Sequence, residues 1–184
     1  MTCKFDISKA LAATGYLLAL IGGKCNLIKL VKMLYYADRT ALQTWHRSIT
    51  GDRLCSMDNG LVVSTIYDLI KGAGSGKLQA TWGRYIGPRH DNTVPLIRMP
   101  DTECLTESER QTLDAAYQKI APMRTGSLIE WCHTFPEWRD PQGSSTRIDP
   151  KSILRLTTAH TAADIAAVEE EANQAAYMAS AFGA

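Results

Sequence analysis

The sequence lacks the patterns that usually mark a metal site or a redox motif. Its five cysteines are widely spaced without a C-x-x-C pair, and its four histidines form neither H-x-x-x-H nor H-E-x-x-H. A zinc ribbon and a thioredoxin-like motif are therefore excluded. We expect the cysteines to be free thiols in a reducing cytoplasm, and we expect neither a metal nor a cofactor.

An excess of charge of one sign and long apolar runs are also missing. The 20 basic and 19 acidic side chains leave a formal net charge of +1, which gives little attraction for nucleic acid or an anionic membrane. The apolar run YLLALIGG at 16–23 is too short to span a bilayer, and the polar residues before it are unlike a signal peptide. We therefore expect a cytoplasmic protein that does not bind membranes, and we do not favour nucleic acid as its partner.

What the chain does have is the composition of an ordinary globular domain. Of its 184 residues, 45% are hydrophobic and 21% charged, which suffices to bury a core. Apolar residues recur at helical spacing in the stretches 6–21, 27–46, 62–71, 105–120 and 125–135. We expect a mainly α fold, a compact helical domain at 1–160 with a small β-hairpin insertion (α+β), followed by an alanine-rich C-terminal helix at 161–184.

Local signals predict where these helices begin and end. Gly22 and Gly23 should end the first helix, and Asn26 should cap the second. Two capping boxes and one aspartate–proline start signal occur at Thr106–Glu109, Ser127–Glu130 and Asp149–Pro150.

The β insertion is expected at about 77–100, where the helical period is lost. KLQATWGRYIG and TVPLIRM are short and β-leaning on either side of PRHDN, which favours a hairpin with Pro95 on an edge strand. Before this insertion, Asn59-Gly60 breaks the chain. The apolar residues that follow fit the spacing of a third helix: Val62, Val63, Ile66, Tyr67 and Ile70.

The second helix contains an acidic residue in an apolar position. At about 100° per residue its leucines, Ala41 and Trp45 form one stripe, and Asp38 falls inside it. A carboxylate there costs several kcal/mol (~2–7) unless it is paired or hydrogen-bonded. Asp38 therefore needs a partner.

The opposite side of the same helix is basic and aromatic. Lys29, Lys32 and Arg39 are predicted to form a solvated face, and Tyr36 lies among them. An exposed tyrosine ringed by cations favours a protein contact surface. The alternative is a tyrosine covered by the next structural element, and the sequence leaves both open.

Catalytic arrangements are weakly supported. Cys132 and His133 are neighbours on a helix, so their side chains point about 100° apart and do not face each other. GAGSG at 72–76 lacks the G-K-[ST] ending of a phosphate loop and reads as a linker. We expect no enzymatic activity.

Three stretches together resemble a known family. NLIKLVKMLYYADRTAL resembles a K-L-x-K-L-L-Y-x-A-[DH] helix, and DNGLVVSTIYDLIK resembles a G-P-V-V-x-x-x-Y segment. SLIEWCHTFPEW resembles a closing S-x-x-L-x-x-x-[ST]-H block followed by P-x-W. The chain is similar over about 7–160 to the Panacea, or SocA-like, family of phage-associated antitoxins.

The resemblance implies a non-enzymatic antitoxin of a toxin–antitoxin system, which neutralises a cognate toxin by direct protein–protein contact. The alternatives are a protease adaptor that delivers the toxin for degradation and a phage–host regulatory interaction protein, with a cryptic hydrolase less favoured. The expected partners are the toxin, a protease in the adaptor alternative, and a second copy that would form a homodimer through the C-terminal helix.

The motif matches, the basic aromatic face and the Asn59 turn give a set of candidate partner-binding or structural residues. They are Tyr35, Tyr36, Asp38, Arg39, Asn59, Gly60, Tyr67, His133 and Trp138. The chain departs from the family at Leu61, where proline is usual, and at Cys132, where Ser or Thr often precedes the histidine. The first change makes the start of the third helix less rigid, and the second puts a hydrogen-bonding role in doubt.

For Asp38 we hypothesise a structural role over a toxin contact. Its carboxylate would accept hydrogen bonds from the backbone amides at 59–62, from His133 or from the Trp138 indole. An anion at a helix N-terminus gains from the free amides and from the helix dipole.

Overall fold

The computed structural model describes residues 4–156 together with 170 and 174. Within them the chain is mainly helical with a small β component, as predicted, and its strands form two small antiparallel sheets. In chain order the elements are α1 (Ile7–Leu20), β1 (Lys24–Asn26), α2 (Leu27–Trp45), β2 (Leu54–Met57), β3 (Gly60–Val63), α3 (Ser64–Ile70), α4 (Gly76–Trp82), β4 (Thr93–Pro95), α5 (Glu107–Ile120), α6 (Thr125–His133), β5 (Thr146–Arg147) and α7 (Pro150–Arg155). The predicted C-terminal helix lies outside the described residues.

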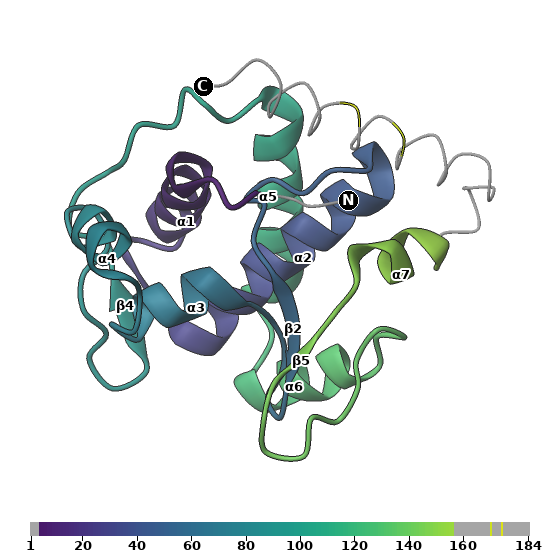
Figure 1. Ribbon diagram of the computed structural model, residues 1–184. Coiled ribbons are helices and arrows are strands. Elements are labelled where there is room, and N and C mark those ends of the chain that lie inside the picture. Colours follow the sequence, from purple (N-terminus) through teal and green to yellow (C-terminus); the bar gives the residue numbers. More distant parts are fainter. Residues whose placement is uncertain (1–3, 157–169, 171–173, 175–184) are drawn as a thin grey trace.

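The helix α2 is the centre of the fold. It contacts α1, α5, α6, α7 and β3, so both of its sides are covered along most of its length. In Figure 1 it runs through the middle of the view, with α1, α4 and β4 toward the left and β2, β5, α6 and α7 toward the lower right. Asn26 caps its start by accepting the Ile28 amide, as predicted, and His46 ends it in the left-handed conformation.

The helices α1 and α5 begin at side-chain caps. Asp6 accepts the amides of Ser8 and Lys9 at the start of α1. Both halves of the predicted Thr106–Glu109 capping box form at the start of α5. Asp149 caps α7 as predicted. The Ser127–Glu130 box was wrong, because α6 already begins at Thr125 after Arg124, which gives no side-chain cap.

The stretch after Asn59 corrects the predicted third helix. Residues Gly60–Val63 form strand β3, which pairs with β2 across the two-residue turn Asp58-Asn59, and only then does α3 begin. The apolar run Leu61–Val63 is buried on both faces, so neither strand alternation nor helical periodicity could identify it. The Asn-Gly pair was the hairpin signal.

The predicted hairpin at 77–100 forms only in part. Residues Gly76–Trp82, expected to be β, are the helix α4. The chain then folds back through the bridges Ile86–Leu96 and His90–Thr93, while β4 pairs with β1 rather than with a strand of its own insertion. Among the described residues, no helix is long and apolar enough to cross a membrane.

Gly60 supplies a first testable prediction. Its φ is +90°, and an added Cβ would lie 2.9 Å from both Cys132 Cβ and Lys32 Nζ. Gly60→Ala is expected to lower the free energy of unfolding by about 1–3 kcal/mol, since strain and overlap add. Gly126→Ala in α6, where an added Cβ meets nothing within 4 Å, should leave it unchanged or raise it by up to about 1 kcal/mol. Equal effects in urea unfolding would refute this account of the turn.

Candidate partner-binding surface

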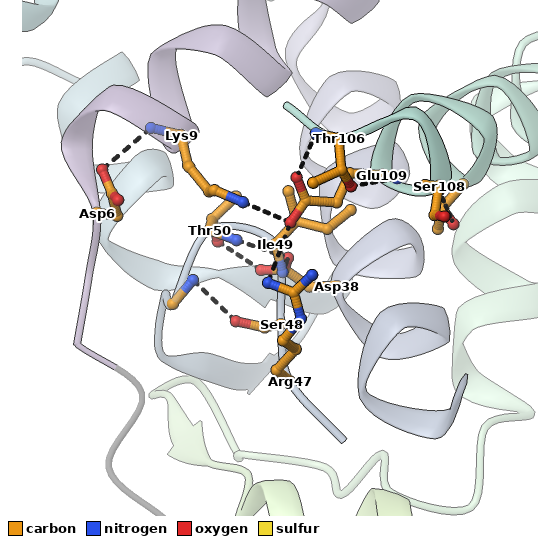
Figure 2. A network of polar contacts seen from close by, with 12 residues as sticks. Asp6, Lys9, Asp38, Arg47, Ser48, Ile49, Thr50, Thr106, Ser108 and Glu109 are labelled. Atoms are coloured by element: carbon orange, nitrogen blue, oxygen red, sulfur yellow. Dashed lines mark hydrogen bonds and ion pairs between the residues drawn. The ribbon is translucent and has the colours of Figure 1, made fainter. Parts of the chain in front are cut away.

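The partners of Asp38 differ from the predicted ones. Its carboxylate accepts the amides of Ile49 and Thr50 at 2.8 and 3.0 Å and the Thr50 hydroxyl at 2.5 Å. Figure 2 shows these groups converging on it from the loop after α2. The proposed bonds to the 59–62 amides, His133 or Trp138 were therefore wrong. Asp38 is 1% exposed and ties α2 to that loop.

A different aspartate caps the third helix. Asp52 is buried and accepts the amides of Thr65 and Ile66 at 2.9 and 2.8 Å. The start of α3 thus has the predicted carboxylate at its free amides, supplied by another residue. Burial raises the pKa of Asp52, and the hydrogen bonds it accepts oppose that rise.

A second polar network lies beside the Asp38 contacts (Figure 2). Lys9 donates to Glu109 at 2.5 Å, and Arg47 approaches the same carboxylate at 3.6 Å. Burial acts to raise the pKa of Glu109, but the Lys9 ammonium and the Thr106 amide outweigh it and leave the pKa below its ordinary value. This network joins α1, α5 and the loop that follows α2. Lys9 is mostly buried in it, whereas Arg47, 57% exposed, contacts it from the surface.

The basic side of α2 is not the solvated face that was predicted. Lys32 is 2% exposed and donates to the Leu61 carbonyl at 2.7 Å, and Lys29 donates to the Ala121 carbonyl at 2.7 Å. The prediction failed because β3 and the end of α5, both distant in sequence, pack on this side.

Arg39 is paired with a buried carboxylate. Its guanidinium donates to Glu137 at 2.5 and 3.3 Å, and the buried Tyr35 hydroxyl donates to Glu137 at 2.9 Å. Burial raises the pKa of Tyr35 well above its ordinary value, and the Glu137 charge adds to that rise. Tyr35 and Arg39 therefore anchor the Pro136–Trp138 segment to α2.

Tyr36 belongs to a half-buried group of rings, which we call the aromatic cluster: Tyr36, Trp131 and Phe135. The Tyr36 ring centroid lies 5.5 Å from that of Trp131, and Trp131 lies 4.7 Å from Phe135 in an edge-to-face arrangement. Arg39 and Lys119 lie over Phe135 and Trp131 at 4.7 and 5.7 Å. Tyr36 is thus partly covered by α6, and the cluster retains partial exposure with cations beside it.

The turn between β2 and β3 is held from the side by two motif residues. His133 Nε2 donates to the Asp58 carbonyl at 3.0 Å, and the Trp138 indole donates to the Met57 carbonyl at 3.3 Å. The two rings stack with centroids 4.2 Å apart. Gly143 donates to the Asp58 carboxylate at 3.1 Å. His133 and Trp138 therefore fix the turn that carries Asn59 and Gly60.

A cavity of about 360 Å³ opens beside this turn. Two of the candidate residues, Asn59 and Tyr67, line it. Its full lining is Leu27, Ile28, Val31, Lys32, Met57, Asp58, Asn59, Val62, Tyr67, Arg89, Asn92, Gly143 and Ser144.

The thiol beside the cavity has the environment of a structural residue. Cys132 is buried, and its sulfur accepts a hydrogen bond from the Leu61 backbone amide. Burial raises the pKa of the thiol, and the nearby Lys32 charge opposes that rise without overcoming it. A thiol held protonated is a poor nucleophile, and His133, its candidate base, is committed to the turn.

Comparison with known families identifies the family to which the chain belongs. A sequence model for the family described as antitoxin SocA-like, Panacea domain, matches residues 30–139. The chain belongs to this family. The matched stretch runs from the first turn of α2 to Arg139, so the Panacea region contains the Asp38 contacts, the aromatic cluster, the turn and most of the cavity lining. No curated protein and no solved structure matches the chain.

Sequence reasoning missed four functional or structural residues of the Panacea region. It did not single out Phe135, Glu137 or Asp52, and it placed Lys32 in solvent. Trp131 and Phe135 are four residues apart, a spacing that could have indicated neighbouring side chains, although Phe135 lies just after the end of α6. The buried environments of Lys32 and Glu137 had no local signal, because they arise from long-range packing.

Proposed function

We propose that this Panacea-family chain is a cytoplasmic antitoxin that neutralises a toxin by direct protein–protein contact and catalyses no reaction. Membership of the antitoxin family carries the proposal. The aromatic cluster supports it, since its half-buried aromatic rings have cations beside them, and aromatic and arginine side chains are enriched in the hot spots of protein interfaces.

The surface we propose for the toxin is the aromatic cluster with Arg39 and Lys119. Its rings are held by α2 and α6, and Glu137 fixes Arg39 from below. A preformed surface loses little side-chain entropy on binding. A complementary toxin surface would present apolar groups surrounded by acidic or carbonyl groups.

The experiment is co-expression with a candidate toxin encoded in the neighbouring reading frame. Wild-type chain should restore growth, and the double variant Trp131→Ala, Phe135→Ala should weaken toxin binding by at least about 2 kcal/mol, or about 30-fold, and lose the rescue. Each ring contributes contact area that alanine cannot replace.

Two matched variants make this test specific. Ile97→Ala removes an apolar side chain that is 59% exposed and lies outside the cluster, and it should preserve rescue. Cys132→Ala should also preserve it if no catalysis through the thiol is involved. Rescue by the folded double variant, or its loss in Cys132→Ala with normal melting temperature, would overturn the proposal.

A further inference from the structure

Lys32 is a buried cation without an acidic partner. Its exposed fraction is 2%, and among the described residues the ion pairs join Lys9, Arg39 and Arg47, not Lys32, to a carboxylate. An unpaired buried charge is costly and is rarely retained without a compensating contact. Lys32 therefore differs from Arg39, which lies two turns further along the same side of α2 and is paired with Glu137.

The ammonium group of Lys32 is fixed in position and has N–H donors that are not used in hydrogen bonds to described residues. Nζ donates to the Leu61 carbonyl at 2.7 Å, and the backbone of Gly60 packs against it so closely that even a Cβ would lie 2.9 Å away. A lysine ammonium carries three donors. In the part of the chain that the structure describes, the Leu61 carbonyl is its one hydrogen-bonded acceptor.

The cavity beside the turn gives the ammonium access to a ligand. Lys32 lines it together with six apolar or aromatic side chains: Leu27, Ile28, Val31, Met57, Val62 and Tyr67. The same cavity is lined by the amides of Asn59 and Asn92 and by Arg89. Binding sites for small groups commonly combine an apolar wall with a few polar residues that fix orientation.

The charges around the cavity select the class of ligand. Lys32 and Arg89 are positive, and Asp58 is negative but already accepts the Gly143 amide. The single buried cation, Lys32, can neutralise one negative charge. The second negative charge of a dianionic phosphate would be repelled by the Asp58 carboxylate. The apolar lining matches an aliphatic or aromatic stem.

We propose that this cavity binds a carboxylate group carried on an apolar stem, with the Lys32 ammonium as its charge partner. Burial lowers the pKa of Lys32 to about 8, so the group is still mostly protonated at neutral pH and can pair with an anion. The carboxylate could come from a small molecule or from a side chain or C-terminus of the toxin; the chemistry is the same.

The test uses acetate, hexanoate and 4-phenylbutyrate, each compared with its uncharged amide, in NMR titrations of the full chain. At least one carboxylate with a stem should bind and shift resonances of the cavity residues. Its amide should bind at least about tenfold more weakly, since the charge pair is lost. Binding of none of the acids up to about 20 mM would overturn the proposal, because that is weaker than a buried charge pair should give.

A matched pair of variants isolates Lys32. Lys32→Gln keeps a donor for the Leu61 carbonyl and removes the charge, and it should weaken carboxylate binding at least about tenfold. Lys29→Gln removes the same charge three residues away, from a lysine that does not line the cavity, and should leave the affinity unchanged. Equal affinity of folded Lys32→Gln and wild type would refute the role of Lys32.

A measurement on the wild type covers the case in which Lys32→Gln does not fold. The side-chain signal of Lys32 should shift with the carboxylate and stay in place with the amide; no shift with either would contradict the proposal. A last arm, which rests on the proposed function, adds purified toxin to the loaded chain. If the toxin displaces the bound carboxylate probe, the natural carboxylate belongs to the toxin. If the probe stays bound, the natural ligand is a small molecule. Either result is consistent with a carboxylate site at Lys32.

Discussion

Replacing Asp38 with alanine is expected to lower the free energy of unfolding by about 3 kcal/mol, or about 6–12 °C in melting temperature. The carboxylate accepts three hydrogen bonds in a site that is 1% exposed. Alanine leaves the amides of Ile49 and Thr50 buried and unpaired, and it opens space between α2 and the following loop. Chemical unfolding followed by circular dichroism measures the effect.

Asp38→Asn is the matched control. Its remaining oxygen can accept both amides, and its NH₂ group can donate to the Thr50 hydroxyl oxygen. At neutral pH the loss should therefore stay below about 1 kcal/mol. If asparagine and alanine destabilise the protein equally, the charge and not the hydrogen bonding matters, and if neither does, Asp38 is not a structural residue.

We also expect the difference in stability between the wild type and Asp38→Asn to depend on pH. Burial raises the pKa of Asp38 to about 7 despite the hydrogen bonds it accepts, whereas an unfolded aspartate has a pKa of 3.8. Because the folded protein holds this proton more tightly, the contribution of Asp38 to stability is fully present below pH 4 and is lost as the pH rises to about 7. Relative to Asp38→Asn, the wild type should lose about 2–4 kcal/mol between pH 4 and pH 8. A difference that stays constant with pH would contradict the raised pKa.

Glu137→Ala is expected to be the most destabilising change at the proposed partner-binding surface, by about 3–5 kcal/mol. The Glu137 side chain is 0% exposed and accepts from Arg39 and Tyr35. Its removal leaves the Arg39 guanidinium, 15% exposed, without its counter-charge. The stacked Trp138 that holds the turn is the next residue, so the surface should loosen as well.

Two controls accompany the Glu137 prediction. Glu130→Ala removes an exposed glutamate from α6 and should change stability by less than about 0.5 kcal/mol. Tyr35→Phe removes one hydrogen bond and keeps the ion pair, and it should cost about 1 kcal/mol. An effect of Glu137→Ala no larger than that of Tyr35→Phe would show that the ion pair contributes little.

The predictions that succeeded relied on local signals. Asn26, Thr106 and Asp149 cap helices at the predicted places because a cap depends only on residues within one turn. The apolar stripe of α2 was correct for the same reason. It also identified Asp38 as a buried acid that needs partners.

The predictions that failed concern which segments contact one another in three dimensions. The partner of Asp38 is the loop after its own helix, and the carboxylate at α3 is Asp52, although spacing alone permits either arrangement. Lys32 and Arg39 look solvated on a helical wheel, but β3 and Glu137 cover them. Val62 and Val63 fit a helix or a buried strand equally, and pairing with β2 decides for the strand.

The central claim, that this Panacea chain acts by binding and not by catalysis, is tested most directly by a stoichiometric titration of toxin activity. Purified toxin is mixed with increasing chain, and residual toxin activity is measured at each molar ratio. Binding predicts that activity falls linearly and reaches zero near a fixed, whole-number ratio, and that the double variant Trp131→Ala, Phe135→Ala shifts or abolishes the endpoint. Complete loss of activity at a small fraction of that ratio, increasing with incubation time, would show turnover and contradict the claim.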